Sequence, residues 1–431
     1  MLFSLDVMKA RKGDCLMLHY GSHDDPHVVM IDGGPRGVYN PFLKPRIRQI
    51  RKARKLQDNK PLPVDVLMVS HVDDDHIQGI LDLTKELVNA QKAKKPQLVQ
   101  VFSFWHNSFE NLIDHTPDEL TASFKSQFGA ASMDGDPPDL TLDVETEDEE
   151  TVVSTMKVLA SIAQGAQLRS DVNMLKFPLN PEFGGELILA QAKAEAIDME
   201  NGLILTVVGP MLPELKKLHE KHQAWLKELK KAGKTPEDVL SDYVDKSVPN
   251  LSSVVVLAEA GGKRVLLTGD ARGDKILEGL ELTGLVEEGG ALEVDVLKVP
   301  HHGSSNNLDP DFFERIIARH YVFSGDGEHG NPERESLEML LNARGDEDYT
   351  VHLTYPVEEI DTGRKQDWEK EQNKEKKRKQ KNPAKKVRED WSPEEHSLAA
   401  LFAANPDFAT KVSIVGDNEP HVIDLLDKFG F

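Results

Sequence analysis

The stretch Ser70-His71-Val72-Asp73-Asp74-Asp75-His76 follows an apolar run over residues 64–69, and the interpretation of the whole chain starts from it. The run is bounded by Pro63 and predicts a buried strand, so the imidazoles and carboxylates stand where that strand emerges into a loop. Carboxylates crowded in this way repel one another and lose hydration unless a positive charge lies between them. A divalent metal ion supplies that charge, and the spacing is typical of a metallohydrolase.

Within this stretch, His71, Asp73, Asp75 and His76 form the pattern His-x-Asp-x-Asp-His. Because alternate residues of an extended loop point to the same side, His71 and Asp73 can share one metal ion. Asp75 and His76 can then turn toward a second metal ion at the start of the next helix. The alternative is a capped helix start whose acidic residues face water, but two histidines at this spacing would have no role there.

A second candidate ligand is Asp270, which follows the apolar residues Leu266 and Leu267 and the turn residue Gly269. A carboxylate at this position can bridge two cations, although many strands end in a Gly-Asp turn that binds nothing. In the presence of the first motif, we favour the bridging role.

Further histidines follow other predicted strands. His301 and His302 follow Pro300 and can supply one metal ligand together with an acid or a substrate contact. His106, after the predicted strand 97–105, is either a further metal ligand or a half-buried loop histidine. His329 could touch substrate or protonate a leaving group; otherwise it is a turn histidine.

The composition limits the possible partners. The chain has 431 residues, a net charge of -22 and one cysteine, Cys15, so a disulfide within the chain and a thiolate-rich metal site are excluded. No basic and apolar leader is visible, and no apolar run approaches the ~18 residues that a membrane helix needs. We therefore expect a soluble cytoplasmic protein that does not bind membranes. The negative charge argues against a broad grip on nucleic acid.

Two segments differ in charge from the chain as a whole. Residues 364–388 contain twelve Lys and Arg residues and four Asp and Glu residues. They form either a solvated linker or an arm that binds phosphates near the active site. Residues 134–150 are acidic and predict a surface loop.

Strands and helices alternate along the chain. We predict strands within 2–20 and at 28–31, 64–69, 97–105, 185–190, 202–208, 252–258, 263–268, 294–299 and 321–324, and helices at 41–56, 77–89, 151–162, 212–231, 274–282, 310–318 and 332–341. Residues 391–431 add a short helix and a final strand pair around Gly416. The metal-type residues recur in loops after strands, as expected of a layered α/β scaffold.

Taken in order, these motifs resemble the metallo-β-lactamase superfamily, and within it the hydrolase domain of ComEC-type competence DNA-uptake proteins and their soluble relatives. The matching words are Lys12-Gly13-Asp14-Cys15, Val29-Met30-Ile31-Asp32-Gly33-Gly34, the stretch from Ser70 to Gly79, Asn250-Leu251-Ser252-Ser253-Val254-Val255, Leu267-Thr268-Gly269-Asp270-Ala271 and Leu297-Lys298-Val299-Pro300-His301-His302-Gly303-Ser304.

The resemblance implies an α/β protein with an αββα sandwich and two divalent metal ions. Residues 1–360 would form the hydrolase domain, with insertions at about 108–201 and 212–249, residues 361–390 a basic linker or arm, and residues 391–431 an extension packed on the core. His71, Asp73 and His106 would hold one metal, Asp75, His76 and either His301 or His302 the other, with Asp270 between them and Asp32 in a supporting role. Asp75, His302 and His329 would be catalytic, and Lys298, Ser304 and Asn331 would bind substrate.

Two departures from the family pattern affect chemistry. Asp73 stands where the superfamily often has histidine, so the site is richer in oxygen and Mn²⁺ competes with Zn²⁺. Asn331 stands before Pro332 where related proteins often have histidine, and His329 lies two residues earlier.

The first functional hypothesis is a metal-dependent hydrolase that uses a dinuclear site to activate water and cleaves phosphoesters, as a nuclease or a small-molecule phosphodiesterase. The second is hydrolysis of a lactone, thioester or amide. The third is an effector that works with a protein partner bound through the insertions.

Overall fold

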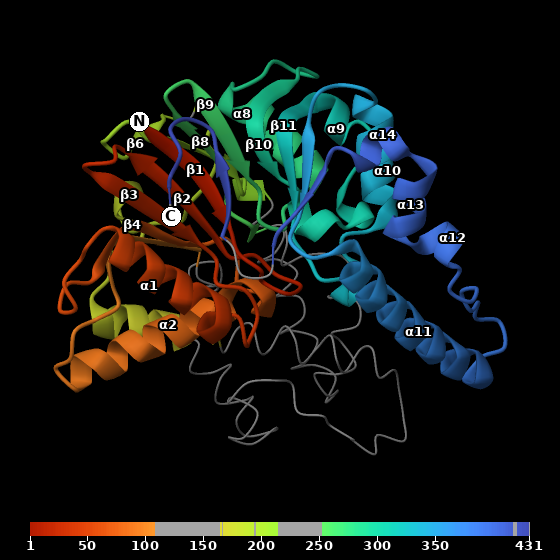
Figure 1. Ribbon diagram of the computed structural model, residues 1–431, viewed down its shortest axis with the longest axis horizontal. Helices are drawn as coiled ribbons and strands as arrows, with labels where there is room; N and C mark the ends of the chain where they lie inside the picture. Colours follow the sequence, from red (N-terminus) through yellow and green to blue (C-terminus); the bar gives the residue numbers. More distant parts are fainter. Residues whose placement is uncertain (108–163, 166, 194, 214–251, 417–419, 431) are drawn as a thin grey trace.

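Two β-sheets packed face to face form the centre of the molecule (Figure 1). The computed structural model describes residues 1–107, 164–165, 167–193, 195–213, 252–416 and 420–430. The first sheet has the order β14 (His421–Asp424), β1 (Leu2–Val7), β2 (Leu16–Gly21), β3 (Pro26–Ile31), β4 (Leu62–Val69) and β5 (Val99–His106). The second has the order β13 (Val412–Ile414), β12 (Thr350–Leu353), β11 (Ile316–Phe323), β10 (Leu292–Lys298), β9 (Lys263–Leu267), β8 (Val255–Ala260), β7 (Ile204–Gly209) and β6 (Ile197–Asp198).

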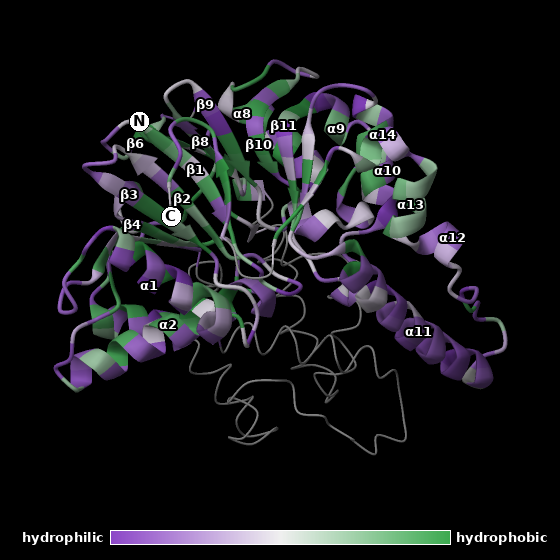
Figure 2. Cartoon of the chain, in the orientation of Figure 1, coloured by the Kyte–Doolittle hydropathy of each residue, from purple (hydrophilic) through white to green (hydrophobic). Residues whose placement is uncertain are grey.

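Apolar side chains from both sheets interdigitate to form the central layer of the core. Leu5 and Val66 from the first sheet pack in the same buried cluster as Val256, Val296 and Val322 from the second. The strands of the second sheet are apolar on both faces because helices cover the other side, as strands buried on two faces require. Figure 2 shows this apolar character along the central strands.

Helices cover the outer face of each sheet. Against the first sheet lie α1 (Lys44–Ala53) and α2 (Asp74–Lys92), which bury residues such as Ile47, Ile80 and Leu83. Against the second lie α8 (Gly273–Thr283), α9 (Phe312–Arg315), α10 (Arg334–Arg344), α13 (Leu398–Ala404) and α14 (Pro406–Ala409), with α12 (Pro393–His396) preceding α13. The predicted αββα sandwich is confirmed.

The parallel strands determine where the functional loops meet. β3, β4 and β5 are parallel in the first sheet, and β9, β10, β11 and β12 are parallel in the second. Because parallel strands end at the same edge of a sheet, the loops that follow them lie side by side, which is the usual place for a binding site in such folds.

The structure corrects three sequence-based predictions. The helix predicted at 310–318 is limited to α9, because residues 316–318 pair in parallel with residues 292–294 of β10. Residues 187–190 are not a strand. Instead, the backbone N–H of Ile188 donates to the side-chain oxygen of Asn107, and the side-chain nitrogen of Asn107 donates to the carbonyl of Ile188. The two strands flanking Gly416 do not pair with each other. β13 joins β12 in the second sheet, and β14 joins β1 in the first.

Several predicted segments lie outside the described residues: the helix at 151–162, the acidic segment 134–150, most of the insertion 108–201, and residues 214–249 of the other insertion. The basic segment 364–388 overlaps the long helix α11 (Val357–Lys381). Among the described residues, no helix is long and apolar enough to cross a membrane.

Candidate metal centre

Buried histidines and aspartates gather at the edge where the parallel strands of both sheets end. They come from six loops: Asp14 between β1 and β2, Asp32 after β3, His71 to His76 between β4 and the first turn of α2, Asp270 after β9, His301 and His302 after β10, and Ser324 after β11. Residues more than 200 positions apart in the chain are thus brought into contact.

The carboxylate of Asp270 lies at the centre of the cluster. Its Oδ2 is 3.6 Å from His71 Nε2 and 3.7 Å from His301 Nε2. Its Oδ1 is 3.1 Å from His76 Nε2 and 3.4 Å from His302 Nε2. The two oxygens therefore face two different pairs of imidazoles, which is the arrangement that a carboxylate bridging two cations requires.

The two flanking aspartates divide in the same way. Asp73 Oδ2 is 3.7 Å from His71 Nε2, on the side of Asp270 Oδ2. The oxygens of Asp75 lie 3.9 Å from His76 Nε2 and 3.7 Å from His302 Nε2, on the side of Asp270 Oδ1. Each side of Asp270 therefore has at least one further carboxylate and two imidazoles.

Several nitrogen and oxygen atoms of this cluster that could bind a metal ion are buried without a hydrogen-bond partner among the described residues. They include the Nε2 atoms of His71 and His302, whereas Nε2 of His76 and Oδ1 of Asp270 have only each other, at 3.1 Å. A buried polar atom left unpaired costs free energy, so such a set demands an explanation. Neutral imidazole nitrogens and carboxylate oxygens are ligands that Zn²⁺ and Mn²⁺ accept, and the residues present fit divalent cations.

Asp32 and Ser70 hold His76 in place. Asp32 accepts hydrogen bonds from the Ser70 backbone N–H at 2.7 Å, from the Ser70 hydroxyl at 2.7 Å and from His76 Nδ1 at 2.8 Å. Because Nδ1 of His76 is occupied by Asp32, its Nε2 is directed at Asp270. The supporting role predicted for Asp32 agrees with this contact, which is typical of carboxylates behind a ligating histidine.

A second buried chain of contacts orients His302. Its Nδ1 is 2.9 Å from Ser324 Oγ, and the Ser324 hydroxyl donates to Asp14 Oδ1 at 2.6 Å. The other oxygen of Asp14 is 2.7 Å from the ammonium of Lys298. Because Ser324 gives its proton to Asp14, its oxygen accepts from His302 Nδ1–H, which leaves Nε2 of His302 as the free ligand atom.

Lys298 was predicted to bind substrate, but it is only 1 % exposed and lies behind the cluster. Its ammonium contacts Asp14 and donates to the carbonyl of Val299 at 3.0 Å. This placement favours a positioning role.

Glycines allow the first turn of α2 to approach the end of β3. A Cβ atom on Gly79 would lie 1.9 Å from the carbonyl oxygen of Gly33, and the Gly33 N–H donates to the carbonyl of His76 at 2.8 Å. The loop before β2 is equally close, since a Cβ on Gly13 would lie 1.9 Å from the carbonyl oxygen of Asp75. The Gly residues in the two N-terminal motifs thus fix the position of Asp75 and His76.

The backbone of the histidine pair is strained. His301 and His302 have φ angles of 47° and 55°, and Asp32 has a φ of 57°. Non-glycine residues in the left-handed region cost free energy and are concentrated at functional sites. Here the two successive left-handed residues bring both imidazoles of the pair against the same carboxylate.

Burial and mutual charge shift the pKa values of the cluster in opposite directions. Burial, together with the nearby carboxylates of Asp75 and Asp270, raises the pKa of Asp73 to about 7. Burial lowers the pKa of His71 to about 4, and the neighbouring His76 adds to that effect. Burial opposes ionisation of Asp270, but the histidines around it outweigh burial and lower its pKa well below the ordinary value.

Four other predicted site residues lie around this cluster. His106, at the end of β5, is buried, and burial lowers its pKa to about 4, with His71 among the groups that act on it. His329 lies on a short turn, its Nε2 3.2 Å from Lys12 Nζ, with its side chain 40 % exposed. Asn331 donates to the carbonyl of His301 at 3.4 Å. Ser304 is buried, and its hydroxyl donates to Glu333 at 3.4 Å.

Asp14 and Ser324 were not predicted as site residues. Asp14 belongs to the quoted word Lys12-Gly13-Asp14-Cys15, which was the only signal available, and Ser324 ends a predicted strand without any motif. Their contact joins residues 310 positions apart, so it becomes visible only in the fold.

Comparison with known proteins finds a family match that spans the N-terminal part of this site. Residues 14–160 match the family model of the metallo-beta-lactamase superfamily. The match includes Asp14, Asp32 and the whole stretch from His71 to His76, whereas Asp270 and the histidine pair lie beyond it. The two-sheet architecture is consistent with the fold of that superfamily.

Similarity to curated proteins is confined to short segments. Microtubule-associated protein 1A of Rattus norvegicus is 34 % identical over 116 residues, and that of Homo sapiens is 32 % identical over 113 residues. In both cases the aligned part is 26 % of this chain and 4 % of the relative's length. Microtubule-associated protein futsch of Drosophila melanogaster is 45 % identical over 51 residues, which are 12 % of this chain and 1 % of that protein.

Among solved structures, a Parabacteroides distasonis protein whose suggested activity is that of a metal-dependent hydrolase aligns over 81 % of this chain and 97 % of its own. The TM-score is 0.30 and the sequence identity 9 %. A similarity this distant says nothing about the reaction.

Proposed function

We propose that this protein is a metal-dependent hydrolase that uses two divalent cations, Zn²⁺ or Mn²⁺, to cleave phosphodiester bonds in a nucleic acid or a small phosphodiester. The observation that carries the proposal is the Asp270 carboxylate, whose two oxygens each face two imidazoles. Well-packed apolar residues would stabilise the fold better than four imidazoles around one buried carboxylate. The cluster is therefore explained by a function and not by stability.

The geometry suggests how the ligands divide. His71 and Asp73 would hold one cation with Asp270 Oδ2, and His301 lies on that same side. Asp75, His76 and His302 would hold the other with Asp270 Oδ1, and His302 is favoured over His301 there because its Nδ1 is already engaged by Ser324. Bound at such a site, the cations would polarise a phosphoryl oxygen and lower the pKa of a coordinated water.

Protein groups beyond the ligands would handle the substrate. His329 is on the turn that Asn331 fastens to the backbone of His301, and it is accessible from solvent. It is therefore the candidate group for giving a proton to the leaving oxygen. Lys12 lies 3.2 Å from His329 at the same rim, and its ammonium is paired with Glu328 at 2.8 Å.

Two features favour a phosphodiester over a lactone, thioester or amide. The resemblance to the hydrolase domain of ComEC-type DNA-uptake proteins points to nucleic acid, and the basic segment 364–388 supplies positive charge to a chain with a net charge of -22.

The test is a measurement of metal content followed by assays with added Mn²⁺ or Zn²⁺ on bis-p-nitrophenyl phosphate, single-stranded DNA and a lactone. Asp270→Asn should lose bound metal and lower the rate on the phosphodiester by at least about 100-fold, because it weakens the ligand shared by both cations. The matched control is Asp295→Asn, which alters a carboxylate on β10 that pairs with Lys263 of β9. This variant should keep both the bound metal and the rate on the phosphodiester. Phosphodiester turnover that survives in Asp270→Asn would refute the proposal.

A further inference from the structure

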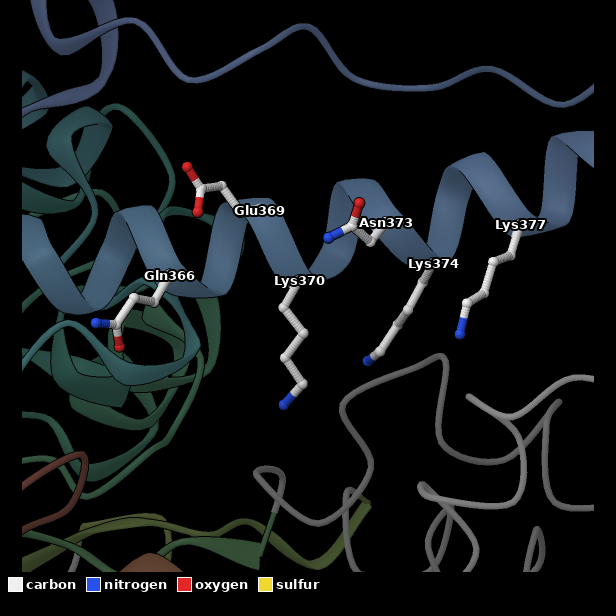
Figure 3. Close-up of a pocket in the computed structure, with 6 residues that line it drawn as sticks. All are labelled: Gln366, Glu369, Lys370, Asn373, Lys374 and Lys377. Carbon is white, nitrogen blue, oxygen red and sulfur yellow. The ribbon is translucent and has the colours of Figure 1, made fainter. Parts of the chain in front are cut away.

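The outward half of α11 presents a row of lysines that no part of the proposed metal centre uses. Lys370, Lys374 and Lys377 are spaced four and three residues apart, which places them on one side of the helix. Figure 3 shows the three side chains extending from that side, whereas Glu369 extends from the opposite side. Lys370 and Lys377 are exposed, whereas Lys374 is half-buried and its ammonium pairs with Glu371 at 2.6 Å.

The row is held in a fixed position. A return segment runs back along the helix, with Arg388 paired to Glu375 at 2.9 Å and Gln372 donating to Asp390 at 2.8 Å. The indole of Trp368 donates to the carbonyl of Glu389 at 2.9 Å. These contacts show that the outward half of the helix is braced, which a flexible linker would not need.

The inner end of α11 begins at the rim of the metal centre. Arg364 donates from Nε to the carbonyl of Gly330 at 3.1 Å, directly after His329. A Cβ on Gly327 would lie 2.1 Å from the carbonyl oxygen of Ile360, so helix and turn are packed backbone to backbone. The same turn is tied to His301 by Asn331. The lysine row therefore leads outward from the residues next to the cluster.

The charge and chemistry of the row suit a chain of phosphates. With a rise of about 1.5 Å per residue, successive lysines are about 4.5–6 Å apart along the helix, comparable to the spacing of phosphates along one nucleic acid strand. The three lysines line a hollow beside α11 together with Gln366 and Asn373, and Glu369 lies at its edge on the other side of the helix. Figure 2 shows the outward half of α11 as hydrophilic.

We infer that the lysine row of α11, Lys370, Lys374 and Lys377, binds the phosphate backbone of a single-stranded nucleic acid and leads it to the metal centre. The inference rests on the proposed phosphodiesterase function and specifies its substrate class. It explains how a chain that is acidic overall, with an acidic centre, could gather a polyanion: the outward half of α11, residues 370–381, carries seven Lys and Arg residues and only two Glu residues.

The experiment measures binding separately from cleavage. In full-length protein carrying Asp270→Asn, the triple variant Lys370→Gln, Lys374→Gln, Lys377→Gln is titrated against a labelled oligothymidylate of about twenty nucleotides by fluorescence anisotropy. Each phosphate contact contributes about 0.7 to the salt slope of single-strand binding, so three contacts weaken binding roughly 20-fold between about 50 and about 200 mM salt. The triple variant should lack this salt-dependent part of the affinity. At the lower salt concentration it should bind at least about tenfold more weakly than the protein that carries Asp270→Asn alone.

The matched control removes three exposed lysines elsewhere, through Lys52→Gln, Lys92→Gln and Lys95→Gln on α1 and at the far end of α2. It should bind like the parent protein. Equal binding by the row variant and this control would overturn the inference. So would displacement of the oligonucleotide by polyglutamate of equal length at equal or lower concentration, which would assign the row to an acidic polypeptide. Because binding is measured without turnover, a wild-type protein that fails to hydrolyse any phosphodiester would overturn the proposed function alone.

Discussion

At the scale of single residues, the chain of contacts from Lys298 to His302 determines which nitrogen of His302 is available to a metal. Ser324→Ala would remove the acceptor for Nδ1–H and allow the imidazole to take the other tautomer or to rotate. Groups that orient a ligating histidine typically change metal affinity by 10–100-fold, so we expect a loss of about that size in a chelator competition assay.

The rescue and control variants separate orientation from general destabilisation. Ser324→Thr keeps the hydroxyl and should restore most of the affinity. Ser22→Ala removes a hydroxyl that caps an exposed turn and should leave metal binding unchanged. If Ser324→Ala bound metal as tightly as the wild type, the proposed orientation of His302 would be wrong.

At the scale of elements, the first turn of α2 places two of the candidate ligands, and its position depends on Gly79. Gly79→Ala would put a methyl group 1.9 Å from the carbonyl of Gly33, so either α2 or the end of β3 must move. We expect a loss of about 1–3 kcal/mol in the free energy of unfolding, measured with urea, together with weaker metal binding. Asn89→Ala changes an exposed position of the same helix to a better helix former and should not destabilise the protein.

Short-range patterns were sufficient to predict some elements and insufficient for others. The ligand motif between β4 and α2 is local, and its strand and helix have unambiguous apolar patterns. The residues after α9 are different, because Ile316 and Ile317 are compatible with either a helix or a strand. Pairing with β10 decides in favour of the strand, and that partner lies more than 20 residues away in sequence.

The contacts between distant loops could not be predicted at all from local patterns. The hydrogen bond from Ser324 to Asp14 depends on two sheets coming together at one edge. Likewise, the strands around Gly416 have the composition of a hairpin, but each finds a longer neighbour at the edge of a different sheet.

At the scale of the whole molecule, three histidines connect the two sheets. Nδ1 of His320 on β11 is 3.0 Å from Nε2 of His352 on β12, and Nδ1 of His352 is 2.8 Å from Nε2 of His421 on β14. Burial, followed by the charges that His421 and His320 would carry, lowers the pKa of His352 from 6.5 to about 3. The folded protein thus holds His352 neutral.

The consequence for stability has a definite sign. Below pH 6.5 the unfolded chain binds a proton at His352 that the folded protein does not accept, so the contribution of this group to stability declines as the pH falls from about 6.5 toward 3. His352→Asn should reduce the slope of unfolding free energy against pH by up to about 1.4 kcal/mol per pH unit in this range. Urea unfolding at several pH values measures the slope, and His23→Asn, at an exposed position, should leave it as in the wild type. A slope that is the same in His352→Asn and wild type would contradict this account.

The pairing of β14 with β1 also affects how the protein is made. Ser4 and Asp424, which are hydrogen-bonded across these two strands, are 420 residues apart in the chain. At about 5–20 residues per second, a ribosome needs on the order of 20–80 s to deliver the second strand after the first. During that interval the outer edge of β1 presents unpaired backbone groups, which are a template for association with other nascent chains. Protection of β1 until β14 has been synthesised would therefore prevent such association.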